Sequence, residues 1–418
     1  MSRSDDHHLN GIPVKAKDGG ASAASYRSNG RRLLLFVLVG GVLCVACLAH
    51  LGLRYRTSHS SPMPPARAAW TQLAPSAPTA VYTSAGRITA MAVQPGGGQR
   101  YLVLEEWLPK DAEGLWGYRR LVRVDISSAK THLLLHSSAA STRPDPGWIA
   151  CARSGRVAVQ EVRLGSRDYE YRIMVLEPDG RWSAVTTWSE DLQAPDGWSP
   201  DSSSLLMDRF SPRSYARRFA VASATSPANV FVEAPVADQD IPQAVWSSDG
   251  SHIYALVPSR SRRMLRLVEI AWPSRTETEI FSGGLGHLSV AEKSGDVVVL
   301  TPSRGGKFII WRRRVGAAPE ETGVTLSSYP MEAEVSPSGR HLAVVYGKEG
   351  VGDGGMRLCD LDDGSEVQVP GTVGKNIQML HWALEGRALA FTIVPKGVSD
   401  WEDKATGTQV WLVRVRGN

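Results

Sequence analysis

Residue types that can perform catalysis occur throughout this sequence, but the spacings that known catalytic sites require are mostly absent. The chain contains no Gly-x-Ser-x-Gly, no His-Glu-x-x-His and no complete phosphate-binding loop. Its one Cys-x-x-Cys pair, Cys44 and Cys47, lies inside an apolar run where it would face lipid. The sequence therefore predicts no catalytic residue and no cofactor, and it leaves enzymatic activity uncertain.

A small group of polar residues could form a site if the fold brings its members together. Each of them stands just before a turn signal in a β-rich stretch: Asp196, His287, Glu332, Glu334 and His381. If these stretches line a central channel, their carboxylates and imidazoles could bind a metal or transfer protons. Glu332, Glu334 and His381 are the candidate metal ligands. The alternative is a solvated channel lined by ordinary polar groups.

Arginine and aromatic residues gather in the segments expected to join the second and third strands of each sheet. Such segments share one face of a ring of sheets, and clustered cations raise the local potential and attract anionic partners. Asp208 is the only acid in the segments of the third, fourth and fifth sheets. The partner-binding candidates are Trp107, Trp116, Tyr118, Arg119, Arg120, Arg209, Arg213, Tyr215, Arg217, Arg218, Arg260, Arg262, Arg263 and Arg304. The first five belong to an inserted loop expected over 107–120. A solubilising surface is the alternative.

Internal repeats predict the strands that must position these residues. WSPDS at 198–202 is echoed by WSSDG at 246–250, by VSPSG at 335–339 and more loosely by WALEG at 382–386, each followed by a β-rich run. Weaker copies centre on Gly98, Gly155 and Gly295. The seven turn positions are 44 to 57 residues apart, and most spacings lie near 46, which suits a four-stranded sheet. The longest spacing contains the expected insertion.

These phrases resemble the repeat of the TolB-like β-propeller family, which is Trp-Ser-Pro-Asp-Gly followed by an apolar strand. The resemblance covers about residues 80–418 and implies an all-β propeller in which Trp198, Trp246 and Trp382 pack between blades. The spacings predict seven blades, with six or eight still open. The Tol–Pal protein itself has six blades and a further α/β domain, so its partners are not carried over. The strand at Gln409–Val415 should pair with Ala80–Ser84 and close the ring.

The N-terminal part predicts a single transmembrane helix. Residues 33–53 are apolar except for His50 and are long enough to span about one hydrocarbon core. Arginines at 31 and 32 favour an N-terminus in the cytoplasm. The predicted organisation is a disordered cytoplasmic tail (1–30), an anchor (31–53), a proline-rich stalk (54–78) and the propeller (79–418). A cleaved signal peptide is the alternative to the anchor.

Composition fits an exported bacterial domain. Hydrophobic residues make up 42% of the chain, the formal net charge is only +5, and no Asn-x-Ser/Thr acceptor occurs. Cys151 and Cys359 are expected to be buried thiols. We expect a membrane-anchored extracytoplasmic scaffold, periplasmic or on the cell surface, that binds an acidic protein or another anionic envelope component and no nucleic acid. A hydrolase or lactonase, or a ligand sensor using the channel mouth, is the alternative.

Overall fold

The computed structural model describes residues 74–109, 116–138, 148–165, 168–213, 216–223, 226–235, 243–258, 265–283, 286–303, 307–327, 330–346, 354–394 and 408–416. They belong to the unit Thr71–Asn418. The predicted tail (1–30), the anchor (31–53) and the stalk as far as residue 73 lie outside the described residues. Within the described part, no helix has the length and apolar character needed to cross a membrane.

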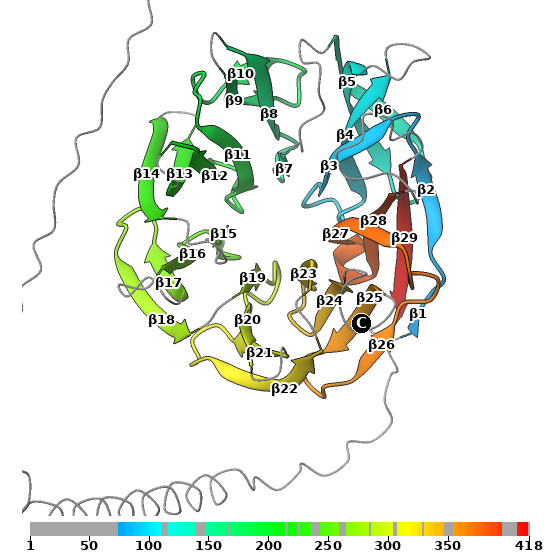
Figure 1. The fold of residues 1–418 in the computed structure, drawn as a ribbon, viewed down its shortest axis with the longest axis vertical. Coiled ribbons are helices and arrows are strands. Elements are labelled where there is room, and N and C mark those ends of the chain that lie inside the picture. Colours follow the sequence, from blue (N-terminus) through cyan, green and yellow to red (C-terminus); the bar gives the residue numbers. More distant parts are fainter. Residues whose placement is uncertain are drawn as a thin grey trace, which may run out of the picture. The chain divides into compact units, whose positions relative to one another are not determined.

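Seven β-sheets of four or five strands follow one another around a ring, with the first strand of each sheet innermost (Figure 1). Each strand pairs antiparallel with its successor, so each sheet is one blade of a β-propeller. Blades 1 to 3 comprise β3 (Arg87–Val93), β4 (Tyr101–Pro109), β5 (Trp116–Asp125) and β6 (Thr131–Ser138); β7 (Ile149–Cys151), β8 (Val157–Leu164), β9 (Tyr169–Leu176) and β10 (Trp182–Ala184); and β11 (Leu192–Trp198), β12 (Ser204–Ser211), β13 (Ala216–Ser223) and β14 (Ser226–Pro235).

Blades 4 to 6 have the same order. They comprise β15 (Gln243–Trp246), β16 (His252–Pro258), β17 (Leu265–Ala271) and β18 (Glu277–Gly283); β19 (His287–Val290), β20 (Val297–Pro302), β21 (Phe308–Arg313) and β22 (Glu320–Leu326); and β23 (Glu332–Val335), β24 (His341–Tyr346), β25 (Gly355–Asp360) and β26 (Glu366–Gln368). The sequence prediction of seven blades is confirmed, because every predicted turn position falls in the turn between the first two strands of its blade.

The last blade joins the two ends of the described chain. β27 (Asn376–Ala383), a short 3₁₀ turn (Leu384–Gly386), β28 (Ala388–Val394) and β29 (Gln409–Arg416) are followed in space by β2 (Thr79–Thr83) and β1 (Ala74–Pro75). β2 pairs antiparallel with β29, as the sequence predicted for the closing strand. β1 pairs with the end of β29, so pairing already begins within the range predicted for the stalk.

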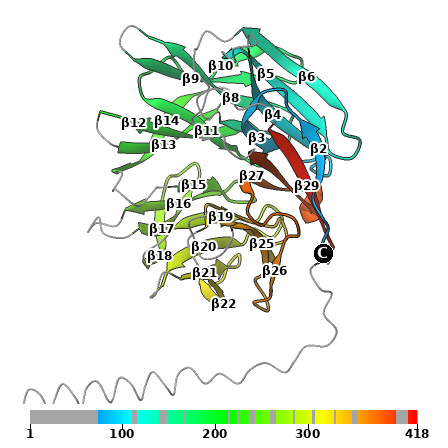
Figure 2. The ribbon, with the colours of Figure 1, turned by 45° about the vertical axis from the view of Figure 1, so that its right-hand side comes forward.

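The hydrophobic core is divided among the contacts between blades. The described residues form seven buried clusters, and each cluster draws its side chains from two consecutive blades. One of them joins blade 7 to blade 1 through side chains such as Leu102 and Leu412. The ring is therefore closed by apolar packing as well as by strand pairing, and Figure 2 shows the same blades in an oblique view.

The tryptophans of the repeat connect neighbouring innermost strands. The indole N–H of Trp198 donates to the carbonyl oxygen of Ala150 (3.1 Å), that of Trp246 to Gly197 (3.2 Å), and that of Trp382 to Glu334 (2.8 Å). In all three cases the acceptor lies on the preceding blade. The predicted packing of these rings between blades is confirmed, and the hydrogen bond explains why the position favours tryptophan over phenylalanine.

The turns that follow are held by a shared hydrogen-bond pattern. The Ser247 hydroxyl donates to Asp249 (2.7 Å), whose carboxylate accepts the amide of Ser251 (3.0 Å), and Ser199 and Asp201 repeat this arrangement in blade 3. Gly250 takes a positive φ of 76°, which costs glycine little. The turns are thus specified locally. We call this side of the ring the turn face, and the opposite side the loop face.

Candidate functional site

The loop face carries two kinds of segment, because strands alternate in direction along the chain. The hairpins between second and third strands end there, and so do the connections from one blade to the next. The sequence prediction of a basic face considered only the hairpins. The connection between β10 and β11 adds Glu190 and Asp191 to the same face, beside the arginines of blade 3.

The predicted residues of blade 1 lie in strands and not in an inserted loop. The spacing there is long because β4 and β5 form an extended hairpin. Trp107 is only 6% exposed, so its side chain belongs to the core. The carboxylate of Glu105 accepts a hydrogen bond from Arg119, and that of Glu106 accepts one from Arg120. These two guanidinium groups neutralise buried acids inside the propeller.

Both arginines also reach an adjacent blade. Arg119 donates to the carbonyl oxygen of Gln160 in blade 2 (2.5 Å), and Arg120 donates to the hydroxyl of Tyr82 in blade 7 (3.0 Å). Trp116 and Tyr118 lie in β5. The loop predicted over 107–120 was therefore wrong at both of its ends, because strand pairing continues further than the repeat spacing indicated.

The predicted arginines of blade 3 have acidic neighbours. Arg217 forms an ion pair with buried Asp208 (2.5 Å) in β12. Arg218 lies 3.6 Å from Asp191, and the exposed Arg213 pairs with Glu190. Arg209 is half-buried in β12. Asp208 is the only acid of the predicted segments, but the connection from blade 2, which the sequence prediction did not consider, brings Glu190 and Asp191 beside the same arginines. Tyr215, Arg260, Arg262, Arg263 and Arg304 lie outside the described residues.

A surface cluster that the sequence prediction missed lies on the loop face of blades 2 and 3. The guanidinium groups of Arg163 and Arg172 lie 4.2 Å and 4.3 Å from the ring centroid of Trp188, so both contact this ring. The adjacent Leu164 is 70% exposed. We call Arg163, Leu164, Arg172 and Trp188 the loop-face cluster. The signal that could have found it is the tryptophan in the connection between β10 and β11.

Arginine stacked on tryptophan is a favourable arrangement at an interface. Each stacked pair at an exposed site contributes about 0.5–1 kcal/mol and holds the ring in one orientation. Glu170 pairs with Arg163 (2.6 Å) and Glu161 with Arg172 (2.5 Å), so both planes are fixed from a second side. A preorganised aromatic surface with an exposed aliphatic neighbour is the composition of protein-binding hot spots.

The polar residues predicted to line the channel mostly tie neighbouring blades together. Glu332 illustrates this role. β27 contains a bulge, where two residues of β27 oppose one of β28, and the amides of Met379 and Leu380 are released from the ladder. The Glu332 carboxylate accepts both amides, at 2.8 Å and 2.6 Å. Its position is explained by the backbone of the next blade.

The two histidines of the channel also bind neighbouring strands. His381 Nδ1 lies 3.3 Å from Glu334, and its Nε2 donates to the carbonyl oxygen of Met91 in blade 1 (2.9 Å). Desolvation opposes the charged imidazole, but Glu334 outweighs it, and the pKa of His381 is raised. Burial lowers the pKa of His287, whose Nε2 bonds the carbonyl oxygen of Ala333.

The hydrogen bonds of the predicted metal ligands Glu332, Glu334 and His381 give these residues a structural role. Among the residues that the structure describes, no three His, Cys, Asp or Glu side chains are grouped to hold a metal ion. Glu332, Glu334 and His381 do lie together, as the sequence indicated. Their lone pairs and protons, however, are directed at backbone groups of blades 7 and 1. The two described thiols, Cys151 and Cys359, are buried and unbridged, as predicted.

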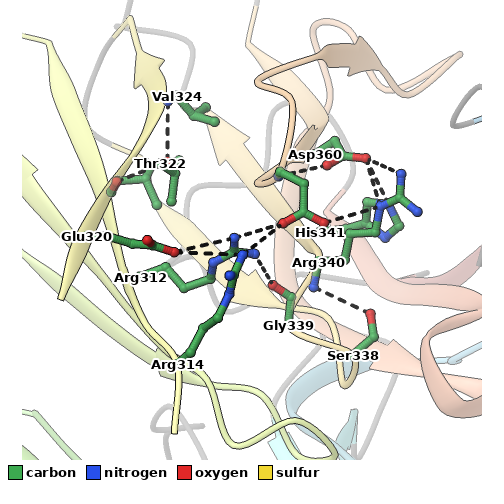
Figure 3. A network of polar contacts seen from close by, with 12 residues as sticks. Arg312, Arg314, Glu320, Thr322, Val324, Ser338, Gly339, Arg340, His341 and Asp360 are labelled. Atoms are coloured by element: carbon green, nitrogen blue, oxygen red, sulfur yellow. Dashed lines mark hydrogen bonds and ion pairs between the residues drawn. The ribbon is translucent and has the colours of Figure 1, made fainter. Parts of the chain in front are cut away.

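A polar network on the turn face joins blades 5 and 6 (Figure 3). Buried Arg312 of β21 donates to Asp362 (2.8 Å) and to the carbonyl oxygen of Gly339 (3.4 Å). Arg340 pairs with Asp360 (2.9 Å) in the same network. A buried guanidinium is stable only when it is paired and hydrogen-bonded. The network thus fixes the contact between two blades.

Asp196 is the exception among the predicted channel residues. It is the extra residue of a bulge in β11, between Pro195 and Gly197, and its side chain is exposed. No hydrogen bond or ion pair links it to another residue in the part of the chain that the structure describes. Surrounding protein and the nearby Asp208 carboxylate raise its pKa well above the ordinary range, and Arg217 opposes the shift.

Comparison with known proteins supports the fold and goes no further. No family model matches the chain, and no curated protein matches its sequence. The β-propeller domain of the Trilobed protease from Pyrococcus furiosus is 10% identical, with a TM-score of 0.53 over 78% of this chain and 94% of that one. Oligogalacturonate lyase in complex with manganese is 11% identical, with a TM-score of 0.55 over 82% and 96%.

TolB from Acinetobacter baumannii is among the similar structures, at 13% identity and a TM-score of 0.43 over 76% of this chain and 82% of that one. The Trilobed domain is described as having an open velcro topology, whereas β2 of this chain pairs with β29. The fold and the comparisons together define the class: the described chain is a seven-bladed β-propeller. Identities this low carry no activity from one propeller to another.

Proposed function

We propose that this chain is a membrane-anchored interaction module whose propeller binds an acidic partner through its loop face. The observation that carries the proposal is the loop-face cluster, where Arg163 and Arg172 hold Trp188 in place beside exposed Leu164. Such a surface presents a rigid aromatic ring at low entropic cost to a partner. Arg213, which is exposed and paired only at the surface, extends it towards blade 3.

The preference for an acidic partner rests on charge that is not already neutralised. Several described arginines of the loop-face segments in blades 1 to 3 have intramolecular carboxylate partners: Arg119, Arg120, Arg163, Arg172, Arg213, Arg217 and Arg218. The segments 259–264 and 304–306 carry Arg260, Arg262, Arg263 and Arg304 and no acid. These four residues, together with Lys307, are positive charges that have no acid in their own segments. We therefore assign attraction of the partner to blades 4 and 5, and the apolar contact to blades 2 and 3.

The membrane topology of the chain and its relationship to TolB-like propellers are part of the same proposal. Residues 31–53 would form the anchor, with the tail in the cytoplasm and the propeller outside it. Two features favour a TolB-like propeller: the repeated serine–aspartate turns, and the tryptophans of blades 3, 4 and 7 that donate a hydrogen bond to the preceding blade. Protease treatment of spheroplasts tests the topology: digestion of the propeller in intact spheroplasts is expected, and its protection there would reject the outside location.

An enzyme working at the channel polar groups is less well supported. Hydrogen bonds to neighbouring blades already occupy the side chains of Glu332, Glu334 and His381. A general acid or a metal ligand needs a free lone pair or proton facing a substrate. The scaffold interpretation needs no such group, and we prefer it for that reason.

The experiment compares co-purified proteins from membranes that contain the full chain. A double reversal, Arg260→Glu with Arg263→Glu, is expected to remove the partner and the salt sensitivity of its binding. Trp188→Ala is expected to lower the recovery of the partner, while the binding that remains keeps its salt sensitivity. Arg181→Glu is the matched control, because this arginine is exposed on the turn face and pairs only with Asp179. Equal partner recovery in all variants would reject the loop face as the binding surface.

A further inference from the structure

A cavity of about 210 Å³ lies at the mouth of the central channel on the turn face. Its walls come from the innermost strands and following turns of blades 2 to 5, with Pro95 of blade 1 at its edge. The residues that give it chemical character are Arg153, Asp196, Trp198, Trp246 and Glu292. This volume is below that of a site for a drug-sized ligand, so an occupant must be small.

The charges at the edge of this cavity compensate one another. Arg153 of blade 2 donates to Glu292 of blade 5 across the channel (2.9 Å), and Gln99 of blade 1 donates to the same carboxylate. Asp196 is the remaining charge in the wall. Its nearest cation, Arg217, already forms an ion pair with Asp208. Within the described residues no cation pairs with Asp196, whose carboxyl group lines the cavity. Because desolvation and Asp208 raise the pKa of this carboxyl group, a cation bound in the cavity would favour its ionised form.

Trp198 and Trp246 line the cavity but offer it no hydrogen-bond donor, because their polar atoms are already used. The indole N–H groups of Trp198 and Trp246 both donate to backbone carbonyl oxygens of the preceding blade. An uncompensated carboxylate next to aromatic surface is the chemistry that recognises ammonium groups. An anion would instead have to displace Glu292 from Arg153 and approach Asp196.

We propose that this cavity binds a small ammonium compound, with the Asp196 carboxylate as its counter-charge and Trp198 and Trp246 as its walls. The bulge in β11 places Asp196 in this site. The extra residue turns one carboxylate into the channel without breaking the pairing on either side. The site is separate from the loop face, so it does not depend on the proposed scaffold function.

Isothermal titration calorimetry on the full chain in a maltoside detergent tests the proposal with choline as the probe. The neutral carbon isostere of choline, 3,3-dimethyl-1-butanol, measures the contribution of charge. We expect choline to bind in the millimolar range or better and the isostere to bind at least about tenfold more weakly. Asp196→Asn should weaken choline binding about tenfold, and Asp196→Glu should retain it. Asp179→Asn, a surface aspartate outside the cavity, is the control.

Three results would overturn the proposal. They are no binding of choline by the unaltered protein, equal binding of choline and its isostere, or equal choline binding by Asp196→Asn. Sulfate that binds and displaces choline would instead assign the cavity to anions through Arg153. The variant should fold, because Asp196 makes no hydrogen bond that asparagine would lose. An undiminished melting temperature verifies this, and Asp196→Ser provides a second neutral replacement.

Discussion

Replacing Trp382 by alanine tests whether the repeat tryptophans hold adjacent blades together. The ring is 3% exposed and packs in the cluster that joins blades 6 and 7, with Leu358 and Phe391. Its indole N–H also donates to Glu334 (2.8 Å). Truncation of a buried tryptophan costs about 3–5 kcal/mol, because it removes apolar burial and leaves a cavity. The lost hydrogen bond to the carbonyl oxygen is about 1 kcal/mol of that total.

The corresponding change in melting temperature can be measured on the full chain by circular dichroism. At about 2 °C per kcal/mol for a domain of this size, Trp382→Ala should melt about 6–10 °C lower. Trp382→Phe keeps most of the ring and loses the N–H, so a fall of about 2–4 °C is expected. Fluorescence is less useful, because the chain has 13 tryptophans.

Trp188→Ala is the matched control, since the same side chain is removed from a half-exposed site. Its two stacked arginines suggest a loss of about 1–2 kcal/mol, and so a smaller fall in melting temperature. If Trp382→Ala lowers the melting temperature no more than Trp188→Ala does, the indole of blade 7 is not a structural tie and our reasoning about the repeat is wrong.

Three further predictions concern the turns, the network and the closure. Hydrogen bonds from the two serines of its turn lower the pKa of Asp249 to about 2, against about 3.9 when unfolded. The stabilising contribution of ionised Asp249 is therefore present above about pH 4 and is lost as the pH falls towards 2. The difference in melting temperature between the unaltered protein and Asp249→Asn should narrow over that range. A constant difference would contradict this prediction. Asp362→Ala should cost about 3 kcal/mol and more than Arg312→Met, because it leaves buried Arg312 with only the more distant Glu320 (3.9 Å) as a carboxylate partner among the described residues, whereas Arg312→Met removes the buried charge itself. Denaturant titration of both variants checks this, and an equal cost would contradict it. A chain beginning at Ser84 lacks β1 and β2 and exposes the edge of β29, and we expect it to aggregate in size-exclusion chromatography; a stable monomer would show that strand closure is dispensable.

Much of the fold could be predicted because its determinants are local. The turn after Trp246 is specified by Ser247, Asp249 and Gly250 within five residues, so a copy of that phrase marks the same turn in another blade. The distance between copies then gives the number of strands per blade. Even the closing pair, β2 with β29, follows from counting strands in an incomplete last blade.

The candidate sites could be predicted only in part, because they depend on neighbours that are distant in sequence. Spacing placed Glu332 and His381 on innermost strands correctly. It could not indicate that a bulge in the next blade would present two free amides to Glu332. Nor could it indicate that Trp188, between two blades, would contact both Arg163 and Arg172.

The sequence by itself determined the repeat, the closing strand and the tryptophans between blades, because each of these is encoded by short hydrogen-bonded turns and by strand periodicity. It favoured seven blades but left six or eight open, and the structure decided for seven. Only the tertiary structure decided which charges remain available. Arg119, Arg120 and Arg217 meet carboxylates from neighbouring strands, and most channel groups meet the backbone of the next blade. Asp196 has no ion-pair partner among the described residues, because a single extra residue in β11 turns its carboxyl group into the channel. Electrostatic pairing acts over a few ångströms in space, and the folded ring sets those distances.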